Sequence, residues 1–350
     1  MTTAGTLHWL IALAPVLALA GLFVWLDPYR LMSRREMAAV LFAGAAAGIA
    51  AYPMSGAILD LLPLDFTTYS RFVAPFAEEA LKAVVVVALF ALNRVGFKLD
   101  AAIQGFAVGA GFAVTENILF LASPAALDLG TWLVRGLGTA VMHGGTAAVM
   151  MTVTHELCEQ SVQRRAAHDW RLRPGWFVPG YLLAVLIHGA FNQFPGQPQL
   201  AMLTVLVTVP LALFTIFQFG NGEAHALLDQ DSSEHAAALD ALVGGGFPDT
   251  ESGRRIAAFA LAWEAGVLAE PIRRYLEELT RLVLEAERVL LAQCDSDALV
   301  TSPAAWAGFA QLATLEAELG RPLLAELAPL LPFTRNDWWE LGELRGRARA

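Results

Sequence analysis

Long apolar runs dominate the first 220 residues of the chain and do not continue beyond them. A helix needs about 20 mostly apolar residues to cross the hydrocarbon core of a bilayer. Seven runs are of roughly this length, at residues 7–27, 37–60, 71–93, 101–122, 131–154, 177–194 and 200–219. This pattern predicts an all-α protein in which residues 1–220 form a polytopic membrane helix bundle of about seven spans.

Basic residues lie in every second loop, and this sets the predicted orientation. The loops after the first, third and fifth spans contain Arg30, Arg34, Arg35, Arg94, Lys98, Arg164, Arg165, Arg171 and Arg173. The loops after the second, fourth and sixth spans contain no Lys or Arg, apart from Arg71 at a span boundary. Because loops rich in basic residues face the cytoplasm, we expect a multi-pass protein of the cell membrane with its N-terminus outside and residues 221–350 in the cytoplasm.

Residues 221–350 are predicted to form an acidic, soluble helical domain. Residues 1–220 hold 12 basic and 12 acidic side chains, whereas the rest holds 11 and 21, so the net charge of −10 arises after residue 220. Apolar residues recur at helical spacing over 251–269 and 271–293. On the second of these helices, Leu276, Leu279, Leu282 and Val283 share an apolar face, and Glu277 and Glu278 are expected to face solvent. The acidic charge argues against nucleic-acid binding, and a cytoplasmic partner or a regulatory role stays open.

A small set of ionisable side chains falls inside the predicted spans. A charge at the bilayer centre costs at least ~2.5–3.5 kcal/mol, so each member is a functional candidate. The set comprises Glu78, Glu79, Lys82, Glu116, Arg135, His143 and His188, with Asn117 and Asn192 as polar companions. From the rise of a helix, Glu78, Glu116 and His188 lie roughly 10 Å from the outer ends of their spans, and His143 roughly 18 Å. Four helices therefore bring these groups to a similar level in the outer half of the bilayer.

The spacing of these residues indicates which of them can meet. Lys82 follows Glu79 by three residues and Glu78 by four, so it can pair with either carboxylate. Arg135 either pairs with a site carboxylate or orients its own span. Gly105 and Gly109 form a GxxxG pattern, which lets two helix backbones approach closely. A structural clip would explain a single Glu–Lys pair or a lone His, but two adjacent carboxylates repel each other, and the whole group at one depth favours a functional site.

Three motifs in order resemble those of a known family. "EEALK" (78–82), "FAVTE" (112–116) and "HGAFN" (188–192) are similar to the EExxK, FxxxE and HxxxD motifs of PrsW-type intramembrane proteases. That family has a further histidine between the second and third motifs, where His143 stands. Asn192 occupies the position where Asp is usual, as in the distantly related CAAX-prenyl proteases. The resemblance covers residues 70–200 and does not reach the acidic C-terminal part.

The resemblance implies hydrolysis of peptide bonds in membrane-anchored regulatory proteins such as anti-sigma factors. Such chemistry needs a water, a base that activates it and donors for the oxyanion. Glu78 or Glu79 is the expected base, and Lys82 would keep the other one ionised. His188 and Asn192 would donate to the oxyanion, with Glu116 and His143 positioning the water.

Two other interpretations of the same residues stay open. In the first, zinc is held by Glu116, His143 and His188, and a glutamate of the 78/79 pair is the base; no HExxH motif accompanies this set. In the second, the protein is not a hydrolase. Its intramembrane charges would then belong to an ion- or proton-coupled transporter or to an inactive scaffold whose C-terminal part binds partners.

Overall fold

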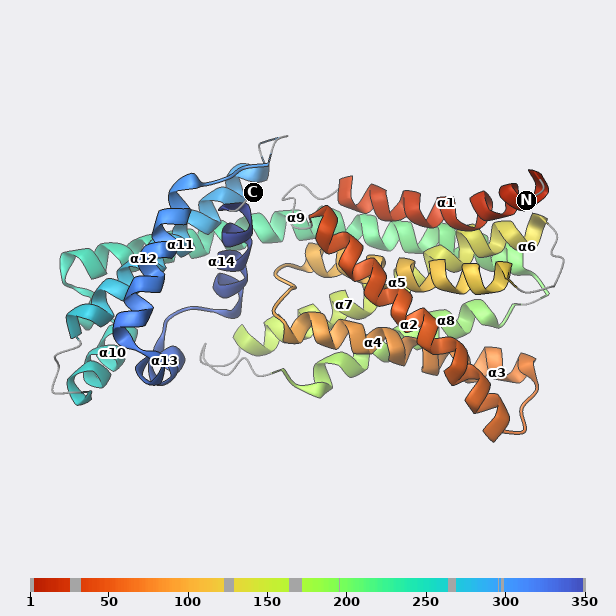
Figure 1. Ribbon diagram of the computed structural model, residues 1–350, viewed down its shortest axis with the longest axis horizontal. Helices are drawn as coiled ribbons and strands as arrows, with labels where there is room; N and C mark the ends of the chain where they lie inside the picture. Colours follow the sequence, from red (N-terminus) through yellow and green to blue (C-terminus); the bar gives the residue numbers. More distant parts are fainter. Residues whose placement is uncertain are drawn as a thin grey trace. The chain divides into compact units, whose positions relative to one another are not determined.

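The computed structural model describes residues 3–25, 33–122, 129–163, 172–194, 196–263, 269–294, 296 and 299–348. These residues form α-helices joined by short turns and contain no β-strand, which confirms the predicted all-α class (Figure 1). The described residues fall into two compact units, one built from residues up to Gln160 together with Leu172–Asn221, and the other from Gly222 onward.

In the part of the chain that the structure describes, the first unit contains seven complete helices, nearly all of α7 and the start of α9. Their bounds are α1 (Thr3–Trp25), α2 (Arg34–Leu61), α3 (Phe66–Phe72), α4 (Ala74–Ala91), α5 (Lys98–Leu121), α6 (Leu129–Leu133), α7 (Ala140–Gln163), α8 (Phe177–Asn192) and α9 (Pro198–Gly244). Helix α9 does not end at the predicted domain boundary near residue 220 but continues to Gly244 without a break.

Among the described residues, four helical segments are long and apolar enough to cross a membrane. They are Arg34–Leu61, Lys98–Phe120, Pro174–Asn192 and Pro198–Ile216. Their outward faces carry exposed apolar side chains such as Phe42, Leu186 and Leu211, which is what a lipid environment requires. The remaining three spans of the predicted seven stay predictions. Helix α4 is only 18 residues long and carries Glu78, Glu79 and Lys82, so it lacks the low charge of an ordinary span.

The third predicted span begins differently from the expectation. The apolar run at 71–93 predicts one helix, but the chain forms α3 up to Phe72 and starts α4 at Ala74. Pro75 explains the break, because a proline near the start of a helix is tolerated while one inside a continuous helix removes a hydrogen bond and clashes with the preceding turn. Arg71 therefore belongs to α3.

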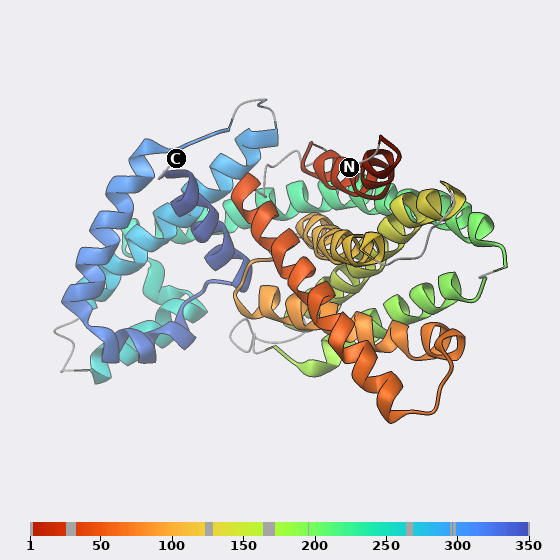
Figure 2. The same cartoon turned by 45° about the vertical axis from the view of Figure 1, so that its right-hand side comes forward.

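Helix α5 is the central element of the first unit. Of its apolar stretch, 72% is buried, against 22–33% for the other three candidate spans. Helix α2 crosses α4 and α5 obliquely and packs most extensively on α5 (Figures 1 and 2). The predicted role of the GxxxG pattern is confirmed, because a Cβ at Gly109 would overlap the carbonyl oxygen of His143, and one at Gly105 would lie 2.6 Å from that of Ala147. These two glycines let α5 and α7 touch backbone to backbone beside the polar residues.

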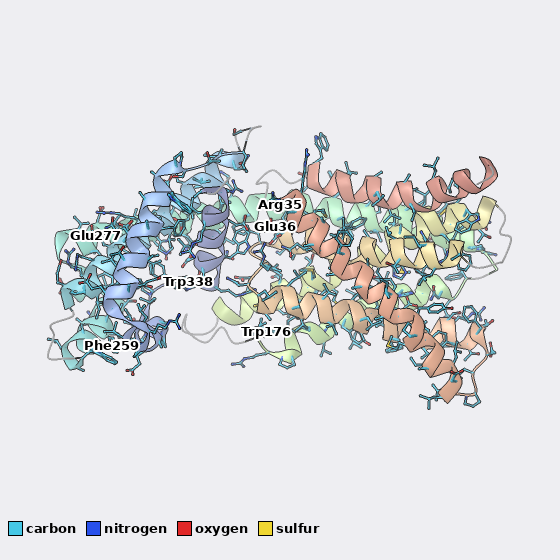
Figure 3. All side chains as sticks on the ribbon, in the orientation of Figure 1. Arg35, Glu36, Trp176, Phe259, Glu277 and Trp338 are labelled. Carbon is cyan, nitrogen blue, oxygen red and sulfur yellow. The ribbon has the colours of Figure 1, made fainter. Side chains whose placement is uncertain are left out.

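A π-helical segment, Val134–Thr139, joins α6 to α7. Segments of this kind leave the regular hydrogen-bond ladder and occur frequently at functional sites. It carries Arg135, and Asn117 on α5 donates from Nδ2 to the backbone oxygen of Arg135 at 3.3 Å. The start of α2 is also fixed by polar contacts, since Ser33 and Glu36 form a capping box and Glu36, which is labelled in Figure 3, pairs with Arg94.

The second unit is a small helical domain with its own core. It contains the part of α9 after Gly222 together with α10 (Glu251–Ala262), α11 (Ala269–Cys294), α12 (Pro303–Leu319), α13 (Arg321–Leu327) and α14 (Arg335–Ala348). The predicted apolar face of α11 is confirmed, because Leu276, Leu279, Leu282 and Val283 are all buried.

One detail of the α11 prediction is wrong. Glu278 was expected in solvent, but it is only 7% exposed. Its Oε1 atom lies so near Gly308 that a Cβ there would come within 2.9 Å. Glycine at 308 therefore gives α12 the room to cover Glu278. Glu277, which is labelled in Figure 3, stays partly exposed and pairs with Arg273 and Arg281.

Candidate active site

Glu79 and Lys82 form a buried ion pair on α4. The Lys82 Nζ atom donates to Glu79 Oε1 at 2.6 Å, and neither side chain is exposed. The sequence left open whether Lys82 serves Glu78 or Glu79, and the structure pairs it with Glu79. Removing either partner would leave the other charge buried and uncompensated, so the two residues act as one unit.

Three donors meet at a single oxygen of Glu79. Besides Lys82, His188 Nδ1 lies 2.8 Å away and Thr146 Oγ1 donates at 3.2 Å. Thr146 was not a candidate in the sequence, although it follows His143 by three residues and so lies on the same side of its helix. The second oxygen, Glu79 Oε2, is buried and has no hydrogen-bond partner among the described residues. A buried carboxylate oxygen of this kind calls for a water, an ion or a substrate group.

His143 connects the α4 pair to α5. Its Nδ1 atom is 2.9 Å from Lys82 Nζ, and its Nε2 atom is 2.8 Å from Glu116 Oε2. An ammonium group only donates, so Nδ1 accepts and Nε2 carries the proton that it donates to Glu116. The ring also packs against Phe112, with 5.0 Å between the ring centroids.

Arg135 is a direct partner of Glu116, which answers the question that the sequence left open. Its guanidinium donates to Glu116 Oε1 at 2.8 Å and lies over the ring of Phe120 at 3.8 Å from the centroid. One carboxylate oxygen of Glu116 thus contacts Arg135 and the other contacts His143. Two donors therefore hold Glu116 as an anion. Another carboxylate of the site is less constrained.

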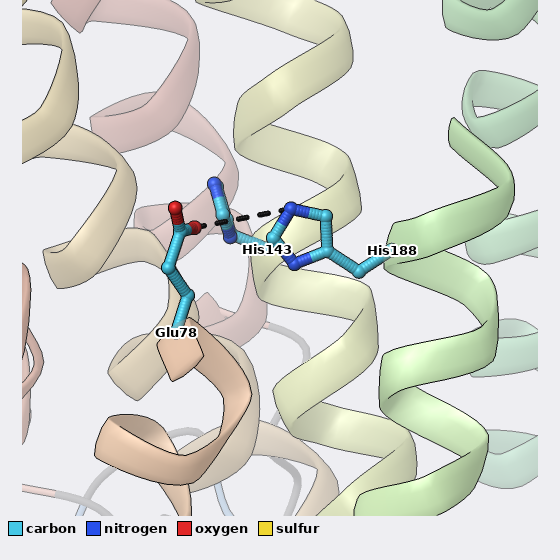
Figure 4. Close-up of side chains that lie close together, drawn as sticks. All are labelled: Glu78, His143 and His188. Atoms are coloured by element: carbon cyan, nitrogen blue, oxygen red, sulfur yellow. Dashed lines mark ion pairs between the residues drawn. The ribbon is translucent and has the colours of Figure 1, made fainter. Parts of the chain in front are cut away.

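Glu78 is the carboxylate that the described contacts hold least. Its side chain is 17% exposed, whereas that of Glu79 is fully buried, and His188 Nε2 lies 3.8 Å from its Oε2 atom (Figure 4). Glu78, His143 and His188 come from α4, α7 and α8, and one ligand atom from each lies within 4.8 Å of the others.

The zinc interpretation that the sequence left open took Glu116, His143 and His188 as the ligands. The group of three whose ligand atoms lie within 4.8 Å of one another contains Glu78 in place of Glu116. Arg135 and His143 contact the two oxygens of Glu116.

Asn192 lies apart from this group. Its Nδ2 atom donates to the backbone oxygen of Ser70 at 2.8 Å, which joins the last residue of α8 to α3. From the sequence we expected Asn192 to stabilise an oxyanion beside His188. In this structure its amide joins two helices.

Glu78, His143 and His188 supply donor types that suit a zinc ion, and His143 must release either Lys82 or Glu116 to bind it. Two imidazoles and a carboxylate are ligands that catalytic zinc sites use, with a fourth position left for water. His188 has the required tautomer, because its Nδ1–H donates to Glu79 and leaves the Nε2 lone pair toward Glu78. A carboxylate that orients a ligating histidine in this way is the usual second partner in zinc sites.

A comparison with known protein families shows to which family the chain belongs. A family model described as "PrsW family intramembrane metalloprotease" matches residues 30–217, more than half of the chain. The chain belongs to the PrsW family. It is accordingly a membrane protein of a protease family, and the match contains every predicted site residue. No curated protein and no solved structure matches the chain.

Proposed function

We propose that this PrsW-family protein is an endopeptidase that cleaves membrane-anchored regulatory proteins, such as anti-sigma factors, in the outer half of the bilayer. The observation that carries the proposal is the meeting of Glu78, His143 and His188 inside a bundle of apolar helices. The proposed topology has seven spans, an external N-terminus and a cytoplasmic second unit, in line with the basic loops after the first, third and fifth spans.

Zinc is the proposed cofactor, with Glu78, His143 and His188 as its ligands. When bound, zinc would polarise the scissile carbonyl and lower the pKa of a coordinated water to about 7. The protein itself orients His188 through Glu79 and keeps Glu79 charged through Lys82. Glu79 is thus proposed as a positioning residue, because its Oε1 atom contacts Lys82, Thr146 and His188.

A metal-free mechanism is the second candidate, and the contacts of His143 favour it. Both ring nitrogens of His143 are engaged, one by Lys82 and one by Glu116. In this mechanism the Glu78 carboxylate takes a proton from the attacking water and later transfers it to the leaving amine. Glu79 and Glu116 stay ionised beside Lys82 and Arg135 and do not take part in proton transfer.

Cleavage by a Glu78 variant tests the proposal under both mechanisms. Wild type, Glu78→Gln and the control Asp60→Asn would be reconstituted in liposomes with single-span anti-sigma-like substrates, and products would be measured by mass spectrometry. Asp60 is exposed at the end of α2, so its variant should cleave like wild type. We expect Glu78→Gln to lose about 10²–10⁴-fold in rate.

Two results would overturn the proposal. If Glu78→Gln cleaves at the wild-type rate, Glu78 is not the working carboxylate. If wild type cleaves no membrane-anchored substrate but moves protons or ions across the liposome membrane, the transporter interpretation holds instead.

A further inference from the structure

A second group of ionisable side chains is buried in the unit that begins at Gly222. It contains Asp231 and His235 on α9, Glu287 on α11, and Asp337 and Glu340 on α14. His235 Nδ1 lies 2.6 Å from Glu287 Oε1, and His235 Nε2 lies 3.6 Å from Asp337 Oδ2. Ligand atoms of these three residues lie within 4.8 Å of one another. The group lies outside residues 30–217, so the family match says nothing about it.

Several oxygens of this group lack partners. Glu287, Asp337 and Glu340 are 0% exposed. Within the described residues, Glu287 Oε2, Asp337 Oδ1 and both oxygens of Glu340 have no hydrogen-bond partner. Native proteins pair nearly all buried polar atoms, and buried carboxylates are normally paired or bound to a metal. Four such oxygens from three residues in one group therefore need an explanation.

Local structure accounts for only part of the group. Asp337 Oδ2 accepts from the Thr334 backbone at 2.6 Å and so closes the first turn of α14. Glu340 follows Asp337 by three residues and therefore lies on the same side of α14. The charges of Asp337, Glu287 and Asp231 raise the pKa of Glu340, as expected for a carboxyl on the side of α14 that carries Asp337. The hydrogen bonds and ion pairs that the described residues give to Glu287, Asp337 and Glu340 involve no Lys or Arg.

We propose that this group binds a divalent first-row transition-metal ion of the zinc class, held by His235, Glu287 and Asp337 with Glu340 as a further carboxylate. One imidazole with several carboxylates is a donor set that suits zinc, iron and manganese. Magnesium and calcium prefer sites made only of oxygens. An ion here would satisfy the oxygens that the protein leaves without partners.

A cavity borders this group at His235. A hollow of about 150 Å³ is lined by Glu234, His235, Leu242, Phe247 and Phe333, among others. His235 thus faces the cavity on one side and the carboxylates on the other. The ligands come from α9, α11 and α14, so a bound ion would tie three helices of the second unit together.

Metal binding by the full-length protein tests the proposal. The parent is the His143→Ala/His188→Ala variant, which removes the candidate site of the first unit, so the outcome does not depend on the proposed protease function. Metal-stripped protein in detergent is titrated with Zn²⁺ by equilibrium dialysis. We expect saturable uptake of about one ion per chain and slower hydrogen exchange in α14, because binding stabilises the folded state.

Variants of the second group show whether the ion lies where we propose. Asp337→Asn and Glu340→Gln should each weaken zinc binding by at least about tenfold, since even residues behind the ligands contribute 10–100-fold. The control Glu326→Gln removes an exposed carboxylate of the same unit and should bind like the parent. The thermal midpoint of the metal-free Glu340→Gln protein shows that a loss of binding is not a loss of folding.

The opposite results are equally clear. Zinc uptake that is the same in the parent, Asp337→Asn and Glu340→Gln would mean an adventitious ion only, and the proposal would be wrong. Absence of saturable uptake in the folded parent would also overturn it. Neither result would affect the protease proposal, which depends on residues of the first unit.

Discussion

The two buried polar groups of this protein balance their charges in opposite ways. In the first unit, Lys82 contacts Glu79 and Arg135 contacts Glu116, so two of three glutamates have a full cationic partner. In the second unit, Glu287 and Asp337 share a single imidazole, His235, within the described contacts, and Glu340 has no partner there. The first group is compensated from within and leaves Glu78 for chemistry. The second group needs a cation from outside or protons of its own.

Protons are the partners that the second group takes when no ion is present. Burial, together with the charges of Asp337, Glu287 and Asp231, raises the pKa of Glu340 well above its usual range. Burial alone would lower the pKa of His235, but its hydrogen bonds to Asp337 and Glu287 raise that pKa to about 10. His235 therefore holds a proton at neutral pH, and the shift of the Glu340 pKa favours its protonated form.

Among the variants of the first unit, loss of His188 should reduce cleavage most. His188→Gln removes the side chain that links Glu79 to Glu78, and we expect cleavage to fall by at least ~100-fold. The control is His155→Gln, because His155 is a buried histidine of the same unit whose Nε2 lies 2.9 Å from the backbone oxygen of Gly96. Single-turnover cleavage in liposomes measures both. Equal activity of the two variants would remove His188 from the mechanism.

The next prediction compares the stability of two variants, each of which lacks one buried glutamate from one of the groups. Glu79→Gln leaves Lys82 buried without a counter-charge and should destabilise the protein by about 3–5 kcal/mol. Glu340→Gln removes a carboxyl whose pKa is raised by burial and should stabilise chelator-treated protein at pH 8 by about 1–3 kcal/mol. Unfolding in detergent at pH 8 measures both variants. If both variants stabilise the protein, or both destabilise it, the two groups do not differ in charge balance as described.

The pH dependence of the Glu340 effect has a fixed sign. A carboxyl whose pKa is higher in the folded than in the unfolded protein contributes stability below its unfolded pKa, and this contribution is lost as the pH rises toward the folded pKa. The pKa of Glu340 is raised, so the advantage of Glu340→Gln should grow from pH 5 to pH 8. An advantage that shrinks over this range would contradict the assignment.

A smaller effect is expected where the helices that hold the first group touch. A Cβ at Gly109 would overlap the His143 backbone, so Gly109→Ala should push α5 from α7 and cost about 1–3 kcal/mol. It should also slow cleavage, because His143 moves with α7. Gly56→Ala is the control, since a Cβ there meets nothing within 4 Å. Unfolding and cleavage of both variants would show whether the close approach matters.

Arg135→Lys should give the smallest change. Lysine keeps the charge opposite Glu116 but loses the planar guanidinium and its stacking on Phe120. A cation–π contact contributes about 0.5–1 kcal/mol at a site of this exposure, so we expect cleavage to fall less than tenfold. Arg135→Met, which also removes the charge, should fall further. Equal rates for the two variants would mean that the charge of Arg135 is not used.

Much of the first site could be predicted from the sequence because charge is so costly in an apolar span. That cost alone singles out Glu78, Glu79, Lys82, Glu116, Arg135, His143 and His188 among the residues of the apolar runs. The pairing among them could not be predicted, because Lys82 at helical spacing reaches two glutamates equally well. Thr146 was missed because a threonine in a span carries no such cost. The π segment at Val134–Thr139 has no signal in the apolar pattern.

The second group could not be found in the same way. In a soluble domain rich in Glu and Asp, a buried carboxylate looks like any solvent-facing one, as the wrong prediction for Glu278 shows. Asp231, Glu287 and Glu340 come from three helices far apart in the sequence, and only the packing of α9, α11 and α14 brings them together.

The zinc content of two glutamate variants tests the central claim about the first site most directly. Wild type, Glu78→Gln and Glu116→Gln would be purified in parallel and their zinc measured by elemental analysis, so that any ion in the second unit contributes equally to all three. We expect Glu78→Gln to contain about one zinc per chain less than wild type, and Glu116→Gln to contain as much zinc as wild type. Equal zinc in wild type and Glu78→Gln, or a loss confined to Glu116→Gln, would contradict the assignment of Glu78, His143 and His188 as the metal ligands.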